Sequence, residues 1–240
     1  MSDPLAGLSR AQLGAVTRPD GALLLLGGAG TGKTEALLRR FAWLAQNEHA
    51  IEHLVLLTRT PAAAERARRR LETLIDAPYE QLFVTTVPKL CADLLHDEAA
   101  EAGLDPFFPV LSRADRLALL LDRIDELTLR RQEIRGNPAP LLARCVARVD
   151  RLKREMVSVA DYRTFAESLR TRAAGDAAEA EAEAELEWAR LYEDHDRLLA
   201  EAGALDSGDL VLCAHRLLHD RPHVRHRVST RFEHVLLDDL

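Results

Sequence analysis

The strongest chemical signal in this chain is a run of eight residues that ends in a lysine and a threonine. The run matches the pattern G-x-x-x-x-G-K-[ST] and consists of Gly27, Gly28, Ala29, Gly30, Thr31, Gly32, Lys33 and Thr34. Glycines let backbone N–H groups approach a phosphate closely, and a helix that begins at the loop turns its positive end toward the same anion. We expect Lys33 to contact the terminal phosphates and Thr34 to supply one oxygen to Mg²⁺. The run therefore predicts an ATP site; the alternative is a glycine-rich turn that only joins two elements.

A pair of carboxylates near the other end of the chain is the natural counterpart of this loop. Val235, Leu236 and Leu237 are apolar and run directly into Asp238 and Asp239. Phosphate-loop enzymes place a carboxylate at the end of a neighbouring strand, where it holds Mg²⁺ through water. We predict that Asp238 serves the metal and that Asp239 stands where a base would activate water. The alternative is a polar strand end with no chemical role.

Alternating strands and helices must position these two groups. Apolar runs bounded by turn residues predict strands at 22–26, 53–58, 83–86 and 234–237, and helical periodicity predicts helices at 9–16, 34–45, 62–75, 88–99 and 207–219. Strands that alternate with helices are typical of an α/β fold with a parallel sheet. We therefore expect the phosphate loop to lie at the edge of a parallel α/β sheet, as in a P-loop NTPase.

The middle of the chain has a different pattern. After Gly103 the periodicity is helical, notably over Ser112 to Arg130 and Pro140 to Met156, and no strand is predicted for about a hundred residues. Ser112 with Asp115, and Ser158 with Asp161, have the spacing of residues that cap helix starts. We predict an α/β domain formed by 1–92 and 205–240, interrupted by an all-helical subdomain at 93–204.

Composition excludes several classes of protein. The net charge of −7 argues against a uniformly basic nucleic-acid coat, and three widely separated cysteines suggest neither a disulfide framework nor a cysteine zinc site. No apolar run approaches the length of a membrane span, and the first ten residues do not resemble a signal peptide. These features predict no membrane association and a cytoplasmic location.

Beyond these two sites, the order of the motifs resembles the UvrD/Rep/PcrA family of superfamily 1A helicases. Leu8-Ser9-Arg10-Ala11-Gln12 is similar to the family's Q motif, which implies that Gln12 reads the adenine edge with its amide. Arg40 lies in the helix after the phosphate loop, where the family has an arginine close to the nucleotide. The alternative for Arg40 is an ordinary charge on a helix surface.

Two further motifs are similar to the family but depart from it. Residues 57–65 resemble motif Ia, with Arg59 in place of an aromatic residue, and 85–89 stand where the family has Gly-Thr-Phe-His-Gly. Aromatic side chains hold single strands by stacking on bases, so both departures weaken the expected grip. The DNA contacts implied by the resemblance fall on Thr58, Arg59, Thr86 and Lys89, with the two cations acting on phosphates.

The rest of the resemblance concerns the helical insert and the second carboxylate site. Residues 148–162 resemble the helix of the inserted domain 1B, 205–210 its return into domain 1A, and 231–239 motif II, with Asp239 where glutamate is usual. The resemblance implies a RecA-like domain 1A and a helical domain 1B of an ATP-driven 3′ to 5′ translocase on single-stranded or partly duplex DNA. We expect the chain to be a fragment that lacks domains 2A and 2B, binds nucleotide weakly and hydrolyses it poorly.

Three classes of function remain open at this point. The first is a helicase or translocase in repair or recombination. The second is a subunit of a helicase-nuclease of the RecB or AddA type, and the third is an ATP-binding module that is no motor. The histidines near Cys213 predict a solvated helix and a loop at Pro222 rather than zinc, and Glu65 is expected to pair with Arg69 on a solvated helix.

Overall fold

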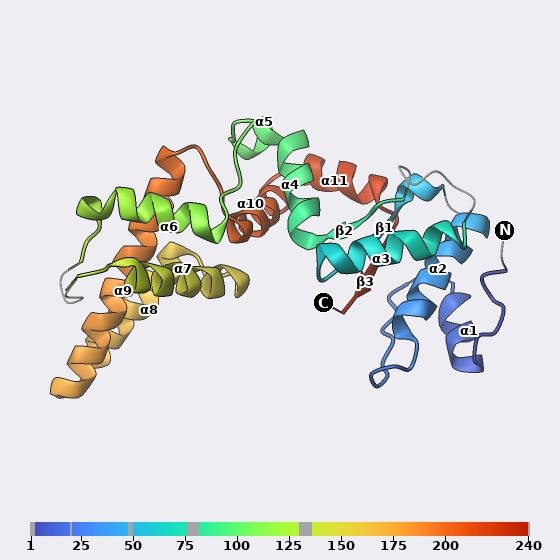
Figure 1. Ribbon diagram of the computed structural model, residues 1–240, viewed down its shortest axis with the longest axis horizontal. Coiled ribbons are helices and arrows are strands. Elements are labelled where there is room, and N and C mark those ends of the chain that lie inside the picture. The colour runs from blue at the N-terminus through green and yellow to red at the C-terminus, as the bar shows by residue number, and fades with distance from the viewer. Residues whose placement is uncertain (1–2, 20, 48–49, 76–81, 130–135, 240) are drawn as a thin grey trace. The chain divides into compact units, whose positions relative to one another are not determined.

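A computed structural model describes residues 3–19, 21–47, 50–75, 82–129 and 136–239 of the chain (Figure 1). The chain divides into two compact units, one formed by residues 1–93 with 217–240 and the other by 94–216. The first unit therefore contains both the phosphate loop and the carboxylate pair. The sequence placed the two divisions at 92/93 and 204/205, whereas the second division of the structure lies within helix α10 (Ser207–Asp220).

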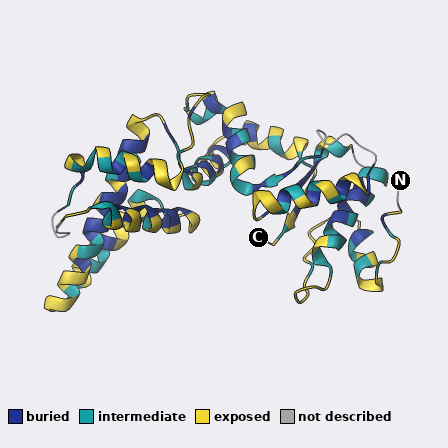
Figure 2. Cartoon of the chain, viewed as in Figure 1, coloured by how far each residue is buried: buried dark blue, intermediate teal, exposed yellow. Residues whose placement is uncertain are grey.

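The first unit is built on a parallel sheet. Its strands are β1 (Leu54–Thr58), β2 (Val84–Thr86) and β3 (His234–Asp238), in the order β2-β1-β3. β1 is buried at every position, as expected for a central strand of a parallel sheet (Figure 2). Its register pairs Leu54 with His234 and Thr58 with Asp238. The sheet therefore places Asp238 at the carboxyl edge, where ligands bind in open α/β folds.

The helices of this unit are α1 (Arg10–Val16), α2 (Lys33–Asn47), α3 (Pro61–Glu72) and α11 (Pro222–Arg231), with the start of α4 (Val87–Asp97) and the short turn η1 (Ile51–His53). α2 and α3 pack against the strands, and their apolar faces form one core with them, which includes Phe41, Leu54, Leu56, Leu71 and Leu236. Thr60 caps α3 by accepting a hydrogen bond from Ala63 N. The predicted α/β fold with a parallel sheet is confirmed.

One predicted strand is wrong. Residues 22–28 have no strand structure, although 22–26 are apolar and directly precede the phosphate loop. Leu24 and Leu26 are 79% and 81% exposed, so the segment gains little from burial to offset the entropy of an ordered strand. It runs beside β3 without forming a ladder with it. The apolar composition was read correctly, but a strand also requires a partner edge.

The second unit is helical throughout its described residues, apart from an isolated bridge between Val110 and Leu205. Its elements are the end of α4, α5 (Ala99–Ala102), α6 (Arg113–Asp122), the turn η3 (Ile124–Glu126), α7 (Ala139–Arg154), α8 (Val159–Arg172), α9 (Asp176–Glu201) and most of α10. The helical insert is therefore as predicted. Arg130, the last residue of the first predicted helix, lies outside the described residues.

Capping and an apolar core account for this unit. Ser112 with Asp115, and Ser158 with Asp161, form capping boxes as the sequence predicted, and hydrogen bonds from the two serines hold the pKa of each aspartate below its usual value. The core joins α6, α7, α8 and α9 through residues that include Leu142, Val146, Tyr162, Trp188 and Leu191.

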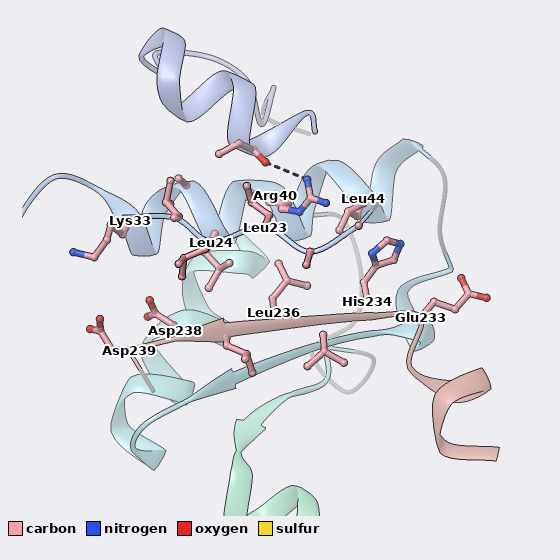
Figure 3. Close-up of a pocket in the computed structure, with 18 residues that line it drawn as sticks. Leu23, Leu24, Lys33, Arg40, Leu44, Glu233, His234, Leu236, Asp238 and Asp239 are labelled. Carbon is pink, nitrogen blue, oxygen red and sulfur yellow. Dashed lines mark hydrogen bonds between the residues drawn. The ribbon is translucent and has the colours of Figure 1, made fainter. Parts of the chain in front are cut away.

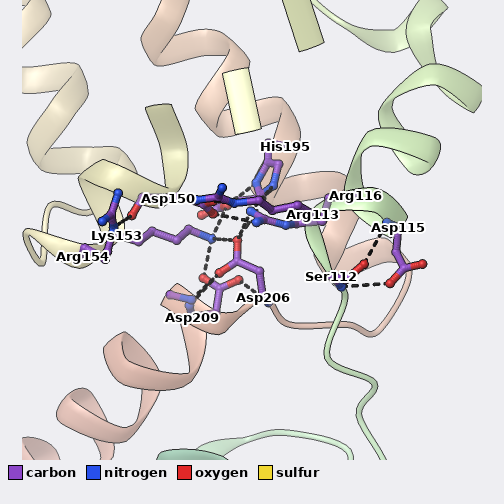
Figure 4. Close-up of polar contacts among 12 residues, drawn as sticks. Ser112, Arg113, Asp115, Arg116, Asp150, Lys153, Arg154, His195, Asp206 and Asp209 are labelled. Atoms are coloured by element: carbon purple, nitrogen blue, oxygen red, sulfur yellow. Dashed lines mark hydrogen bonds and ion pairs between the residues drawn. The ribbon is translucent and has the colours of Figure 1, made fainter. Parts of the chain in front are cut away.

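A buried polar cluster lies beside this core (Figure 4). Arg116 is 1% exposed and donates to Asp150 at 2.6 Å and to Asp206 at 2.9 Å. Lys153 is also 1% exposed, and its ammonium lies 2.8 Å from Asp196, 3.1 Å from Asp206 and 2.6 Å from Asp209. The charges are paired, as buried charges must be, and they tie α6, α7 and α9 to the start of α10.

Two other predictions have clear outcomes. Glu65 pairs with Arg69 on α3 at 2.8 Å, as expected. The loop predicted at Pro222 is wrong, because Pro222 opens helix α11. Proline is favoured at the first turn, where its missing N–H costs no hydrogen bond. None of the helices among the described residues has the length and apolar character needed to cross a membrane.

Candidate nucleotide-binding site

The phosphate loop runs directly into α2, as the motif requires. α2 begins at Lys33, and the side chain of Glu35 lies in its first turn. The Lys33 ammonium donates to Gly27 O at 3.0 Å and to Gly28 O at 2.9 Å, so it lies over the carbonyls of its own loop. A cation held at this position is ready to exchange carbonyl oxygens for phosphate oxygens, which are stronger acceptors because they are charged.

Two glycines of the loop have a structural reason to be glycine. Gly32 has a φ of +80°, and a Cβ there would lie 2.7 Å from Gln12 Nε2. A Cβ on Gly27 would lie 2.7 Å from the Thr31 hydroxyl oxygen. A side chain at either position would therefore crowd a neighbouring side chain, and Gly32 also has a φ that disfavours any other residue.

Gln12 is placed against the loop from α1. Its Nε2 donates to Thr31 O at 3.3 Å, and its Oε1 accepts from Ser9 N at 3.0 Å as part of the cap of α1. The amide thus has the position expected for a residue that contacts the base beside the phosphate loop. Its contact with adenine stays a prediction.

The loop meets the carboxylate pair through one contact. Thr34 Oγ1 donates to Asp238, with distances of 3.0 and 3.1 Å to the two carboxylate oxygens, across 204 positions of sequence. Partial burial raises the pKa of the Asp238 carboxyl above its usual value, and the Asp239 charge adds to the rise, while Thr34 and Lys33 oppose it. A bound cation would favour the ionised form. The two predicted magnesium ligands are therefore neighbours.

The chemistry of this donor set fits Mg²⁺. A hydroxyl and a carboxylate are hard oxygen ligands, and Mg²⁺ in such sites keeps several waters and takes its other oxygens from phosphates. Among the residues that the structure describes, no group of three or more histidine, cysteine or acidic side chains is placed to hold a metal by itself. Thr34 and Asp238 thus fit a magnesium that arrives with nucleotide.

A cavity of about 850 Å³ adjoins the site between residues 21–25, α2 and β3 (Figure 3). Lys33, Asp238 and Asp239 lie at one end of it, and Glu233 and His234 lie at the other. Between them the lining is mainly apolar and includes Leu23, Leu24 and Leu236, together with Arg40. The end with Lys33 combines a cation for phosphate with two carboxylates for a metal ion, directly beside the phosphate loop. The rest of the cavity lies between residues 21–25 and β3, which form no strand ladder with each other.

Arg40 has a structural role that sequence reasoning missed. Its side chain is largely buried, and its guanidinium donates to the carbonyls of Ala15, Val16 and Arg18 at 3.1, 3.2 and 2.9 Å. These carbonyls lie at the end of α1 and just after it, where backbone acceptors lack intrahelical partners. Arg40 therefore fixes α1, and with it Gln12, onto α2. Its predicted contact with the nucleotide is untested.

The residues predicted to contact DNA differ in accessibility. Thr58 and Thr86 are 1% and 8% exposed at the ends of β1 and β2. Arg59 is exposed, and Lys89 is exposed and pairs with Asp93 one turn along α4. A DNA contact by side chains is thus open to the two cations, and all four assignments stay predictions.

With this geometry in place, comparison with known proteins decides the family. Residues 8–240 match the family model of the UvrD/REP helicase N-terminal domain. The chain belongs to this family. It is 24% identical over 236 residues to the ATP-dependent DNA helicase PcrA of Bacillus subtilis (strain 168), covering 98% of this chain and 29% of that protein. The family resemblance read from the motifs is therefore confirmed.

Other members of the family are about equally similar. DNA helicase II of Escherichia coli (strain K12) is 27% identical over 236 residues, covering 98% of this chain and 30% of that protein. DNA helicase II of Haemophilus influenzae (strain ATCC 51907 / DSM 11121 / KW20 / Rd) is 28% identical over 244 residues, covering 100% and 31%. The chain therefore spans about 30% of the length of the curated relatives that it matches.

Proposed function

We propose that this chain is the ATP-binding N-terminal part of an ATP-dependent DNA helicase or translocase, with domain 1A at 1–92 and 205–240 and domain 1B at 93–204. One observation carries the proposal: Thr34 at the start of α2 and Asp238 at the end of β3 meet at 3.0 Å. These are the two positions at which a phosphate-loop enzyme holds Mg²⁺.

Each residue of the site then has a defined task. The loop amides from Gly27 to Gly32 surround the phosphates, Lys33 neutralises the terminal ones, and Thr34 and Asp238 orient the metal. Bound Mg²⁺ supplies positive charge to the leaving phosphate oxygens. Asp239, one residue beyond Asp238, orients and deprotonates the attacking water. Its side chain is one methylene shorter than the glutamate usual in the family, so we expect slow hydrolysis.

The proposal extends to DNA and to the rest of a longer protein. The relatives are named as DNA helicases, which supports DNA as the partner. We further propose that the DNA is single-stranded or partly duplex, that movement is 3′ to 5′, and that the protein acts in repair or recombination in the cytoplasm, as the motifs and composition led us to expect. Leu24, Leu26, Val235 and Leu237 are more than half exposed on the first unit. These exposed apolar side chains are open to contact with another part of a longer protein, and we propose further domains of the 2A and 2B kind there.

DNA-stimulated ATP turnover by the longer protein that contains this chain tests the proposal. Turnover should rise steeply with single-stranded DNA and disappear in Lys33→Ala. ATP turnover that DNA does not stimulate, or the absence of turnover, would instead indicate an ATP-binding module that is no motor. DNA-stimulated turnover together with DNA cleavage would indicate the helicase-nuclease class.

A further inference from the structure

A second cavity, of about 820 Å³, lies on the side of the site that faces α3. Thr34 and Leu38 of α2, Asp238 and Asp239 after β3, and residues of the β1–α3 connection and α3 line it; the last group is Arg59, Thr60, Ala63, Arg66 and Ala67. The volume is many times the ~30 Å³ that one water occupies. It is therefore large enough for a hydrated phosphate group.

Sheet register explains why an arginine enters this cavity. Thr58 pairs with Asp238 in adjacent parallel strands, so the residues that follow them, Arg59 and Asp239, leave the same edge of the sheet. On α3, Ala63 and Ala67 are one turn apart and small, and Arg66 lies between them in sequence. The alanines leave the space, and Arg59 and Arg66 supply its positive charge.

The pairing of the other arginines on α3 makes Arg66 distinctive. Arg68 and Arg69 both form ion pairs with Glu65, and Arg70 pairs with Glu35. Within the described part of the chain, neither Arg59 nor Arg66 has such a partner. Two guanidinium groups thus line the metal side of the site without an acid that neutralises them through a direct contact.

The charges of the lining residues indicate which kind of ligand the second cavity binds. The two arginines balance Asp238 and Asp239 in the free protein, so Mg²⁺ at Thr34 and Asp238 makes the lining positive. An anion is then favoured, and guanidinium groups bind phosphate oxygens through strong charge-assisted hydrogen bonds. Because the lining includes Thr34 and Asp238, the anion that fits is the phosphate farthest along a nucleotide held by the loop.

We propose that Arg59 and Arg66 form a subsite for the terminal phosphate of a nucleoside triphosphate, approached from α3. The subsite rests on the proposed ATP-binding function and adds to it a means of distinguishing triphosphate from diphosphate. Lys33 is proposed to contact the two terminal phosphates of the triphosphate, one of which a diphosphate keeps. Arg59 and Arg66 contact only the phosphate that the triphosphate carries in addition.

Binding of a fluorescent non-hydrolysable ATP analogue and of fluorescent ADP, each with Mg²⁺, tests the proposal on the 240-residue chain. The double variant Arg59→Gln with Arg66→Gln should bind the triphosphate analogue about tenfold more weakly or worse, with ADP affinity changed less than about twofold. Arg69→Gln is the matched control, because Arg69 is on the same helix, exposed and outside the cavity. It should change neither affinity.

The outcomes separate the subsite from the ATP site itself. An unchanged ratio of the two affinities in the double variant, with both nucleotides still bound by the parent chain, would overturn the subsite and leave the ATP site standing. Failure of the parent chain to bind either nucleotide would overturn both. Weaker binding of a single-stranded oligonucleotide without nucleotide, at an unchanged affinity ratio, would assign the arginines to DNA and also overturn the subsite.

Discussion

Replacing Lys153 with methionine should destabilise the helical unit by about 3 kcal/mol or more. The ammonium is 1% exposed and lies within 3.1 Å of Asp196, Asp206 and Asp209. At an effective dielectric constant of about 20, a charge pair near 3 Å is worth roughly 5 kcal/mol before desolvation is subtracted. Methionine has a similar volume but leaves the carboxylates without this cation, and Arg116 compensates only Asp206 among them.

Urea unfolding followed by the fluorescence of Trp188 measures the effect. Trp188 is in the core of the helical unit, and a Trp43→Phe background makes it the only tryptophan, since the chain has two. With a slope of about 2 kcal/mol per molar urea, a loss of 3 kcal/mol lowers the midpoint by about 1.5 M. Arg163→Met is the control, because its ion pair with Glu167 is exposed and worth less than about 1 kcal/mol.

The pH dependence of the stability loss in Lys153→Met is an independent test of the same reasoning. Burial raises the pKa of Asp209 above its usual value, and Lys153 opposes the rise. Without Lys153 the pKa rises further, so the penalty of the variant is present when Asp209 is ionised and fades as pH falls and the carboxyl binds a proton. Equal midpoint shifts for Lys153→Met and Arg163→Met, or a penalty that does not shrink toward acid pH, would refute the reasoning.

Three further predictions concern other sites. Glu35→Gln should cost about 0.5–1 kcal/mol of stability near pH 7, since hydrogen bonds from Arg70 and Arg39 lower the pKa of Glu35 below its usual value. In chemical denaturation, the difference in stability between wild type and variant should vanish as pH falls through this lowered pKa. Burial raises the pKa of the Cys91 thiol to about 11 and of the Cys145 thiol to about 12, so at pH 8 their thiolate fractions are roughly 1 in 1,000 and 1 in 10,000. In an alkylation experiment read by mass spectrometry, both thiols should therefore be labelled slowly until the chain is unfolded. Fast labelling of Cys145 in the folded protein would contradict its burial. Gly32→Ala should weaken nucleotide binding at least tenfold, because the φ of Gly32 is +80° and the new Cβ would lie 2.7 Å from the Gln12 side chain. An unchanged affinity in a nucleotide titration would contradict this prediction.

Local patterns predicted most of the fold. The periodicity of residues 34–45 and 207–219 gave helices that the structure has at α2 and α10, and the Ser-x-x-Asp spacings gave two capping boxes. These features depend on neighbours within a few residues, so one sequence is enough to read them. The phosphate loop is predictable for the same reason.

The features that sequence reasoning missed depend on partners far away in the chain. The 22–26 segment has strand composition but no ladder. Arg40 was predicted to lie near the nucleotide or else to be a helix-surface charge, and its contacts with the end of α1 could not be read from the sequence. Lys153 and Arg116 lie among charged residues on helices, and only the fold brings them to buried carboxylates. The cavity with Arg59 and Arg66 likewise follows from the register of β1 and β3.

The most direct test of the account asks whether Thr34 and Asp238 form one magnesium site with the bound nucleotide. A fluorescent ATP analogue should be titrated into the chain, Asp238→Asn and Asp239→Asn, each with and without Mg²⁺. We predict that Asp238→Asn weakens the Mg²⁺-dependent part of the affinity about tenfold or more, whereas Asp239→Asn leaves it nearly unchanged. An equal Mg²⁺ dependence in the chain and in Asp238→Asn would contradict the central claim.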